Sequence, residues 1–282
     1  MQNEVEKTER PEQEARRPLS KDGPVAIMDS GLGGISVLRE LISVMPEEDY
    51  LYFGDSVNAP YGEKPPEVIR ELCRRNVEML LARGAKCVVI ACNTATSAAA
   101  EVLRQEYPFL PVIGMEPAVK PAAKCGGHPR VLVLATPLTI KGDRLHHLVE
   151  AHADEAEFIL REAPGIVRFV EEGVCDAAPN EALREYLSEL LAEFSLCGQA
   201  KRRVDAVVLG CTHFPFVRRS IVEALGYPAA VYDGARGTAL QTKRRLSESG
   251  LLRESGARGK ILLLNSDESR LPAERMLLEL PE

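Results

Sequence analysis

Two cysteines stand at the ends of two nearly identical segments of this chain. Residues 87–94 read CVVIACNT and residues 206–213 read AVVLGCTH, so Cys92 and Cys211 each follow an apolar run and precede hydroxyl or amide side chains. Such a run, rich in β-branched residues and bounded by a turn, is typical of a strand buried on both faces of a parallel sheet. Ligands bind beyond the carboxyl ends of such strands, so we expect both thiols at a ligand site.

A pair of equivalent thiols suits the inversion of a carbon centre by proton transfer. One thiolate removes a proton from one face of the substrate while the opposite thiol delivers a proton to the other face. A carbanion next to a carboxylate needs fixed donors and a water-poor cleft, and Asn93, Thr94 and Thr212 are placed to supply donors. Because a turn that opens a helix stabilises negative charge, we expect a lowered pKa for both thiols, Cys92 and Cys211.

The remaining sequence alternates between strand and helix patterns, which predicts parallel sheets with right-handed crossovers. Further strands are expected at residues 25–28, 50–53, 112–114, 131–135, 229–232 and, as a late edge strand, 261–264. Helices are expected over residues 35–45, 69–81, 93–107 and 180–194. Two more are expected, one that begins after residue 139 and one that ends at residue 246. The chain is therefore expected to be an α/β protein of two pseudo-symmetric domains, each with a mainly parallel sheet flanked by helices, and with the active site in the cleft between them.

The domain boundaries follow from the repeated strand and from composition. Residues 1–22 are rich in charge and poor in apolar side chains, so we expect a disordered extension there. Residues 23–115 together with 227–282 are expected to form the first domain, and residues 116–226 the second.

Composition favours a small-molecule enzyme over other classes. The 282 residues carry a net charge of −7, which gives no basic field for nucleic acid, and no apolar stretch is long enough to span a membrane. We expect a cytoplasmic location, since the chain begins without a signal-peptide pattern. The seven cysteines show no paired spacing, and the cluster of His146, His147 and His152 is typical of a solvated helix face, so neither a disulfide framework nor a metal site is expected.

Several motifs resemble those of the glutamate racemases, which are members of the aspartate/glutamate racemase superfamily. The resemblance covers residues from about 25 to 246, and its motifs are DSG at 29–31, GDS at 54–56, PYG at 60–62, ACNTA at 91–95, GMEP at 114–117 and GCTHFP at 210–215. It implies interconversion of L- and D-glutamate without any cofactor, a supply of D-glutamate for peptidoglycan synthesis, and a homodimer.

The resemblance also implies roles for individual residues. Cys92 would take the α-proton from D-glutamate with the help of Asp29, and Cys211 would take it from L-glutamate with the help of His213 and Glu171. The implied substrate contacts are Asp29, Ser30, Tyr61, Gly62, Asn93, Thr94, Thr136, Thr139, Thr212 and His213.

One segment departs from the family pattern, and three other functions stay open. Residues 163–168 read APGIVR where the family usually has Cys-Pro followed by bulky apolar residues and a second proline, so Glu171 and its neighbour Glu172 both stay candidates for the partner of His213. The alternative functions are an aspartate racemase or related enzyme, a thiol hydrolase using Cys211 and His213, and a non-enzymatic amino-acid-binding module.

Overall fold

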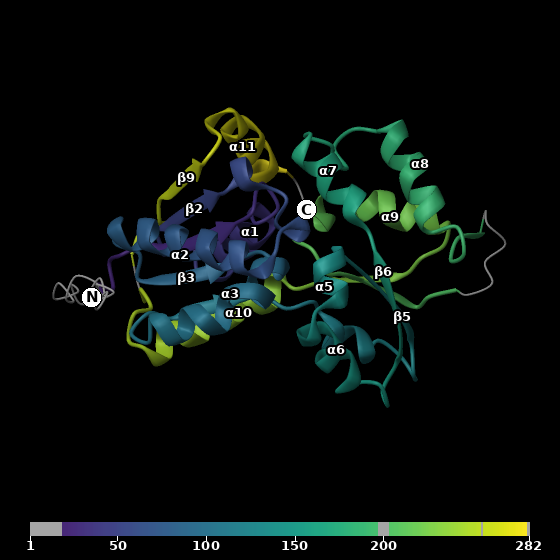
Figure 1. Cartoon of the computed structure of the whole chain (residues 1–282), viewed down its shortest axis with the longest axis horizontal. Helices are drawn as coiled ribbons and strands as arrows, with labels where there is room; N and C mark the ends of the chain where they lie inside the picture. The colour runs from purple at the N-terminus through teal and green to yellow at the C-terminus, as the bar shows by residue number, and fades with distance from the viewer. Residues whose placement is uncertain (1–18, 197–202, 255, 281–282) are drawn as a thin grey trace, which may run out of the picture.

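Two parallel sheets, one in each domain, organise this chain (Figure 1). The computed structural model describes residues 19–196, 203–254 and 256–280. The first sheet has the order β4 (Val112–Gly114), β3 (Cys87–Ile90), β1 (Val25–Asp29), β2 (Tyr50–Gly54), β9 (Ile261–Asn265). The second has the order β6 (Glu157–Glu162), β5 (Arg130–Ala135), β7 (Ala206–Leu209), β8 (Ala230–Asp233). All these strand pairings are parallel, so the predicted fold class is confirmed.

Helices cover both faces of the first sheet. They are α1 (Ile35–Val44), α2 (Pro66–Ala82), α3 (Asn93–Glu106), α10 (Ala235–Glu248) and α11 (Leu271–Glu279). Successive side chains of β1 point to opposite faces: Val25 and Ile27 belong to the apolar cluster that includes α1, whereas Ala26 and Met28 belong to the cluster that includes α2 and α3. Burial on both faces explains why these strands read as continuous apolar runs.

The second sheet follows the same plan. Its helices are α4 (Val119–Ala123), α5 (Pro137–Lys141), α6 (Asp143–Glu150), α7 (Pro164–Glu171), α8 (Glu181–Leu190) and α9 (Arg218–Leu225). Leu132 and Leu134 of β5 pack with α7, α8 and α9, and Val131 and Val133 pack with α4 and α6. The cluster that holds Leu134 continues into α1 of the first domain, so the two domains share one apolar interface.

The boundary expected at residue 227 is corrected by strand pairing. β8 pairs with β7 in the second sheet, and the chain returns to the first domain only at α10, which packs on α1. The sequence alone does not distinguish these arrangements, because a strand pattern does not say which sheet it joins.

Other boundaries also differ from expectation. The extension was expected to reach residue 22, but Leu19 packs on the first core and the carbonyl of Lys21 accepts a hydrogen bond from the buried Nζ of Lys86. Residues 1–18 lie outside the described residues. The helix expected over 180–194 ends at Leu190, and β6 was not predicted because its ends are charged and its residues are only partly buried.

The last part of the chain returns to the cleft side of the first domain. β9 pairs with β2 at the edge of the sheet, which confirms the late edge strand, and a 3₁₀ turn, η5 (Glu268–Arg270), leads into α11. In Figure 1 α11 stands beside α7 of the second domain. Within the described part of the chain, no helix has the length and apolar character needed to cross a membrane.

Candidate active site

Cys92 follows the carboxyl end of β3, where α3 begins. Its thiol caps this helix, because the backbone N–H of Ala95 donates to Sγ at 3.4 Å. The hydroxyl of Ser30, from the loop after β1, lies 3.8 Å from the same sulfur. The predicted helix-opening turn is therefore present at Cys92, and Ser30 is its polar neighbour.

Cys211 follows the carboxyl end of β7 and belongs to a chain of polar contacts. Its Sγ lies 3.6 Å from Nδ1 of His213, and Nε2 of His213 lies 2.6 Å from Oε1 of Glu171. Glu172 is exposed, so the geometry selects Glu171 as the carboxylate that faces the imidazole. The turn after Cys211 leads into a short 3₁₀ helix, η4 (Phe214–Val217), instead of the α-helix expected there.

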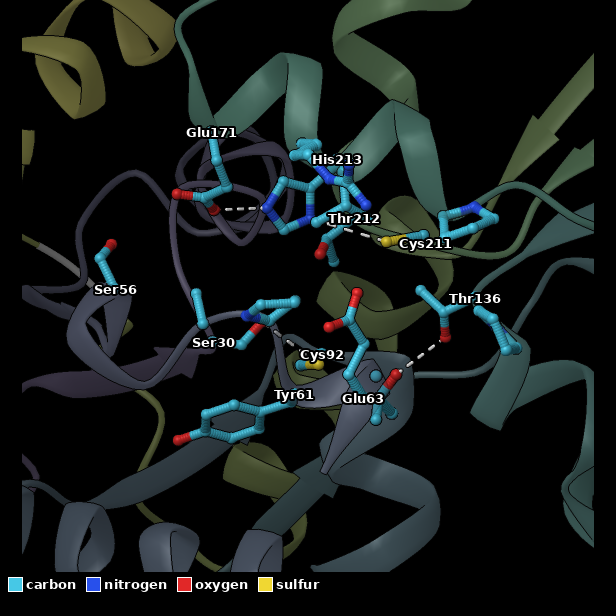
Figure 2. A pocket seen from close by; sticks show the side chains of 18 of the residues that line it. Ser30, Ser56, Tyr61, Glu63, Cys92, Thr136, Glu171, Cys211, Thr212 and His213 are labelled. Carbon is cyan, nitrogen blue, oxygen red and sulfur yellow. Dashed lines mark hydrogen bonds and ion pairs between the residues drawn. The ribbon is translucent and has the colours of Figure 1, made fainter. Parts of the chain in front are cut away.

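Both thiols line one cavity of about 420 Å³ between the domains (Figure 2). The first domain contributes Ser30, Ser56, Ala59, Pro60, Tyr61, Gly62, Glu63, Cys92, Thr94 and Arg270, and the second contributes Thr136, Pro137, Pro164, Val167, Arg168, Glu171, Cys211, Thr212 and His213. The duplicated strands thus bring their cysteines to a common space, as the sequence predicted. Among the residues that the structure describes, no three His, Cys, Asp or Glu side chains are grouped as metal ligands would be.

The electrostatics of Cys92 differ from the expectation. Burial raises the pKa of its thiol, and the negative charge of Asp29 raises the pKa further, against the opposing effect of the Ala95 N–H. The predicted lowering is therefore wrong for Cys92, because removing a thiolate from water costs more than one helix N–H contributes.

His213 and Glu171 favour their charged forms together. Burial by itself lowers the pKa of His213, but its hydrogen bonds to Cys211 and Glu171 raise that pKa well above the ordinary value. For Glu171, burial acts to raise the pKa, yet the hydrogen bond and charge of His213 and the N–H of Leu32 bring it below the ordinary value. An imidazolium–carboxylate pair is therefore the stable form beside Cys211.

Asp29 lies behind the cavity wall. Its Oδ1 accepts the N–H of Gly31 at 3.0 Å, and its Oδ2 accepts the hydroxyl of Thr212, from the second domain, at 3.3 Å. Asp29 is 3% exposed, and burial raises the pKa of its carboxyl group. Asp29 therefore reaches Cys92 through its charge, while Ser30 and Thr212 present the polar atoms that face the cavity.

Three threonine hydroxyls meet where the domains adjoin. Oγ1 of Thr136 lies 3.1 Å from Oγ1 of Thr94 and 3.1 Å from Oγ1 of Thr139. Thr94 and Thr136 line the cavity, and Thr139 supports them from behind. This cluster joins the first turn of α3 to the first turn of α5, so it can present hydroxyl donors to an anionic group.

Of the other predicted contact residues, Tyr61 and Gly62 line the same cavity, whereas Asn93 does not. Asn93 is 4% exposed, and its amide nitrogen and oxygen have no hydrogen-bond partner among the described residues. The Tyr61 hydroxyl donates to Asp55 at 2.6 Å and points away from the thiols, so this residue offers its ring to the cavity (Figure 2). An added Cβ on Gly62 would meet Thr136 at 3.3 Å, so the absence of a side chain leaves this wall open.

Comparison with known proteins shows the family of this chain. The model of the Asp/Glu/hydantoin racemase family matches residues 34–242. This chain belongs to that family. A glutamate racemase of Clostridium perfringens is 41% identical over 262 residues, which cover 92% of this chain and 98% of the relative. The chain is an amino-acid racemase, and the resemblance predicted from its motifs is confirmed.

Two solved structures of glutamate racemases are similar in fold to nearly the whole length of this racemase. The glutamate racemase of Escherichia coli, in complex with L-glutamate and the activator UDP-MurNAc-Ala, has a TM-score of 0.75 and 28% identity, covering 91% of this chain and 92% of the other. The enzyme of Thermus thermophilus, in complex with β-chloro-D-alanine, has a TM-score of 0.70 and 32% identity, covering 92% and 93%.

Sequence reasoning missed several residues of the racemase cavity. Ser56 is the last residue of the GDS motif and Glu63 directly follows the PYG motif, so their place in the sequence could have suggested them. Val167 and Arg168 lie within the segment that departs from the family pattern. Arg270 comes from the C-terminal part of the chain, where no motif signalled a functional residue.

The departing segment has a packing explanation in this racemase. It begins α7, and the N–H of Gly165 donates to the hydroxyl of Tyr186 on α8 at 3.1 Å. A Cβ at Gly165 would lie 2.5 Å from the Tyr186 ring, so the glycine makes room for that ring. Ile166 and Val170 are fully buried on the other side of α7, and this packing holds Glu171 toward His213.

Proposed function

We propose that this racemase interconverts L- and D-glutamate by moving a proton across the α-carbon between Cys92 and Cys211. The observation that carries the proposal is that the two thiols, each from a different domain, line one cavity. The L-glutamate complex of the E. coli relative supports glutamate as the substrate.

The proton transfer proceeds in two steps. From L-glutamate, the Cys211 thiolate takes the α-proton, and the electron pair of the broken C–H bond is delocalised into the α-carboxylate. The Cys92 thiol then gives its proton to the opposite face, which yields D-glutamate, a Cys92 thiolate and a Cys211 thiol. The reverse reaction starts from Cys92, so the two sulfurs exchange roles between enantiomers.

The surrounding groups prepare the two thiols differently. The His213 imidazolium, which is stabilised by Glu171, lies 3.6 Å from Cys211 and places a positive charge beside its sulfur. At Cys92 the raised pKa favours the thiol, which suits its part as the proton donor when L-glutamate reacts. Asp29, behind the cavity wall, places a negative charge near the cavity that favours the ammonium group of the substrate, and a bound ammonium offsets the effect of Asp29 on Cys92.

Polar groups of the cavity bind the carboxylate groups of the substrate. The hydroxyls of Thr94 and Thr136 supply donors at one end of the cavity. Charge developing on the α-carboxylate is stabilised by such fixed donors in a site shielded from water. The use of D-glutamate in peptidoglycan synthesis, a cytoplasmic location and a homodimeric assembly stay predictions from the sequence analysis.

Hydrogen exchange in heavy water tests the proposal. The enzyme is incubated separately with L-glutamate, D-glutamate, L-aspartate and D-aspartate, and deuterium at the α-carbon is measured together with the enantiomer ratio. We expect exchange and racemisation with both glutamate enantiomers and much less with aspartate. Exchange with aspartate alone would transfer the activity to that substrate, and no exchange with any of the four would overturn the proposal in favour of a binding module or a hydrolase.

A further inference from the structure

Arg270 brings the C-terminal segment into the cavity of the active site. It ends the turn η5, immediately before α11, and lines the same cavity as Glu171 and the two thiols. The match to the family model ends at residue 242, so this arginine lies beyond the part that defines the family.

The guanidinium group of Arg270 contacts the end of α7. Nη1 donates to the backbone carbonyl of Glu171 at 2.7 Å. Glu171 is the last residue of α7, where carbonyl groups lack partners inside the helix and carry the negative end of its dipole. A cation at this position therefore satisfies a free carbonyl and stabilises the helix end.

This contact joins the two domains directly behind the polar chain at Cys211. Arg270 belongs to the first domain and α7 to the second, and α11 and α7 face each other in Figure 1. Glu171 is held a second time from the first domain, because its Oε1 accepts the N–H of Leu32 at 2.8 Å. The backbone and the side chain of Glu171 are thus each fixed by a first-domain donor while Oε1 also meets His213.

The turn η5, which carries Arg270, is itself held in place by hydrogen bonds. Asn265, at the end of β9, donates through Nδ2 to the hydroxyl of Ser56 at 3.0 Å and to Oε1 of Glu274 at 2.7 Å. Ser56 lines the cavity and Glu274 of α11 is fully buried. Asp267 caps the turn by accepting the N–H of Ser269 at 3.1 Å. The turn that carries Arg270 is therefore tied to the cavity wall.

We propose that Arg270 is a positioning residue, which holds the end of α7 so that Glu171 stays against His213 and the proton transfer at Cys211 is supported. The inference rests on the proposed function, since it assigns Arg270 to one of the two transfer steps. Removal of Arg270 therefore slows the step at Cys211 and leaves the step at Cys92 intact.

Kinetic isotope effects distinguish the two steps in Arg270→Gln. Because the equilibrium constant of a racemisation is one, kcat/KM falls equally for both enantiomers, and we expect a fall of about 10- to 100-fold, as for the loss of a group that orients a functional side chain. The isotope effect with α-deuterated L-glutamate, whose deuteron goes to Cys211, should rise. The isotope effect with α-deuterated D-glutamate should decline, because its deuteron goes to Cys92.

Two further variants control the experiment. Arg270→Lys keeps a donor and should recover part of the lost rate, and Arg275→Gln makes the same change at an exposed position of α11 and should match the wild type. The inference is overturned if Arg270→Gln behaves like Arg275→Gln, or if its rate falls with both isotope effects unchanged, as general damage to the fold would produce. A wild type that does not racemise glutamate overturns the proposed function as well, whereas an active wild type with a normal Arg270→Gln overturns only the role of Arg270.

Discussion

Glu171 and His213 are joined by a hydrogen bond of 2.6 Å between Oε1 and Nε2. One residue ends α7 and the other follows β7, so the contact depends on how these elements pack within the second domain. The remaining ring nitrogen of His213 faces Cys211, whereas the polar neighbour of Cys92 is the hydroxyl of Ser30. The two halves of the site therefore repeat the strand and the thiol but differ in the polar groups that contact each thiol.

Replacing Glu171 should weaken the reaction without removing either thiol. In Glu171→Gln the imidazolium of His213 loses its counter-charge, so we expect the racemisation rate to fall about 10- to 100-fold. Initial rates with both glutamate enantiomers measure the effect. Glu172→Gln alters the exposed neighbour and should retain the wild-type rate; equal losses in the two variants would contradict the role of Glu171.

The same pair predicts how stability depends on pH. Folding raises the pKa of His213 above its ordinary 6.5 and lowers that of Glu171 below its ordinary 4.5. The His213 contribution is full below pH 6.5 and is lost as the pH rises through the raised value. The Glu171 contribution is full above pH 4.5 and is lost as the pH falls through the lowered value. Urea unfolding should show the largest difference between wild type and Glu171→Gln from pH 4.5 to 6.5, and a difference independent of pH would refute the coupling.

Each thiol should be indispensable. Cys92→Ala and Cys211→Ala should each reduce racemisation by more than a thousandfold, which corresponds to about 4 kcal/mol or more in the barrier. Serine variants should fail as well, because a hydroxyl is a far weaker acid than a thiol. Cys73→Ala changes a buried cysteine outside the cavity and serves as the control. A single variant with near-normal turnover in both directions would remove its thiol from the mechanism.

The fit between Gly165 and Tyr186 predicts a non-additive pair of substitutions. Gly165→Ala places a Cβ about 2.5 Å from the tyrosine ring, so we expect it to lower the free energy of unfolding by about 1–3 kcal/mol. In a Tyr186→Ala background the ring is absent and the added cost of Gly165→Ala should largely disappear. Urea unfolding of the four proteins measures this coupling, and additive losses would show that the ring does not require the glycine.

A buried ion pair supports the first domain far from the cleft. Lys86 and Glu48 are both fully buried, with Nζ and Oε2 2.5 Å apart. Lys86→Met leaves the carboxylate without its cation and should cost about 3–5 kcal/mol of unfolding free energy. Glu48→Leu in the same chain should recover part of this loss. As a control, breaking the exposed pair of Arg184 and Glu181 should cost less than about 1 kcal/mol.

The local patterns predicted most of the strands and the position of both thiols at the ends of two of them. Strands buried on both faces must be apolar throughout, so β3 and β7 were readable from a few residues each, and the cysteines after them were placed at the right edge of the sheet. β6 was missed because an edge strand with charged ends shows no such run. The place of β8 was wrong because hydrogen-bond partners between strands are not encoded in a strand's own pattern.

The sequence by itself determined which residue types could do the chemistry and that they follow two related strands, since both facts depend only on neighbours along the chain. The tertiary structure alone decided that Cys92 and Cys211 share a cavity, that Glu171 and not Glu172 meets His213, and that Arg270 reaches the end of α7. It also reversed the pKa expected for Cys92, because burial results from packing by both domains. Distances and desolvation arise from residues far apart in sequence, and no local pattern contains them.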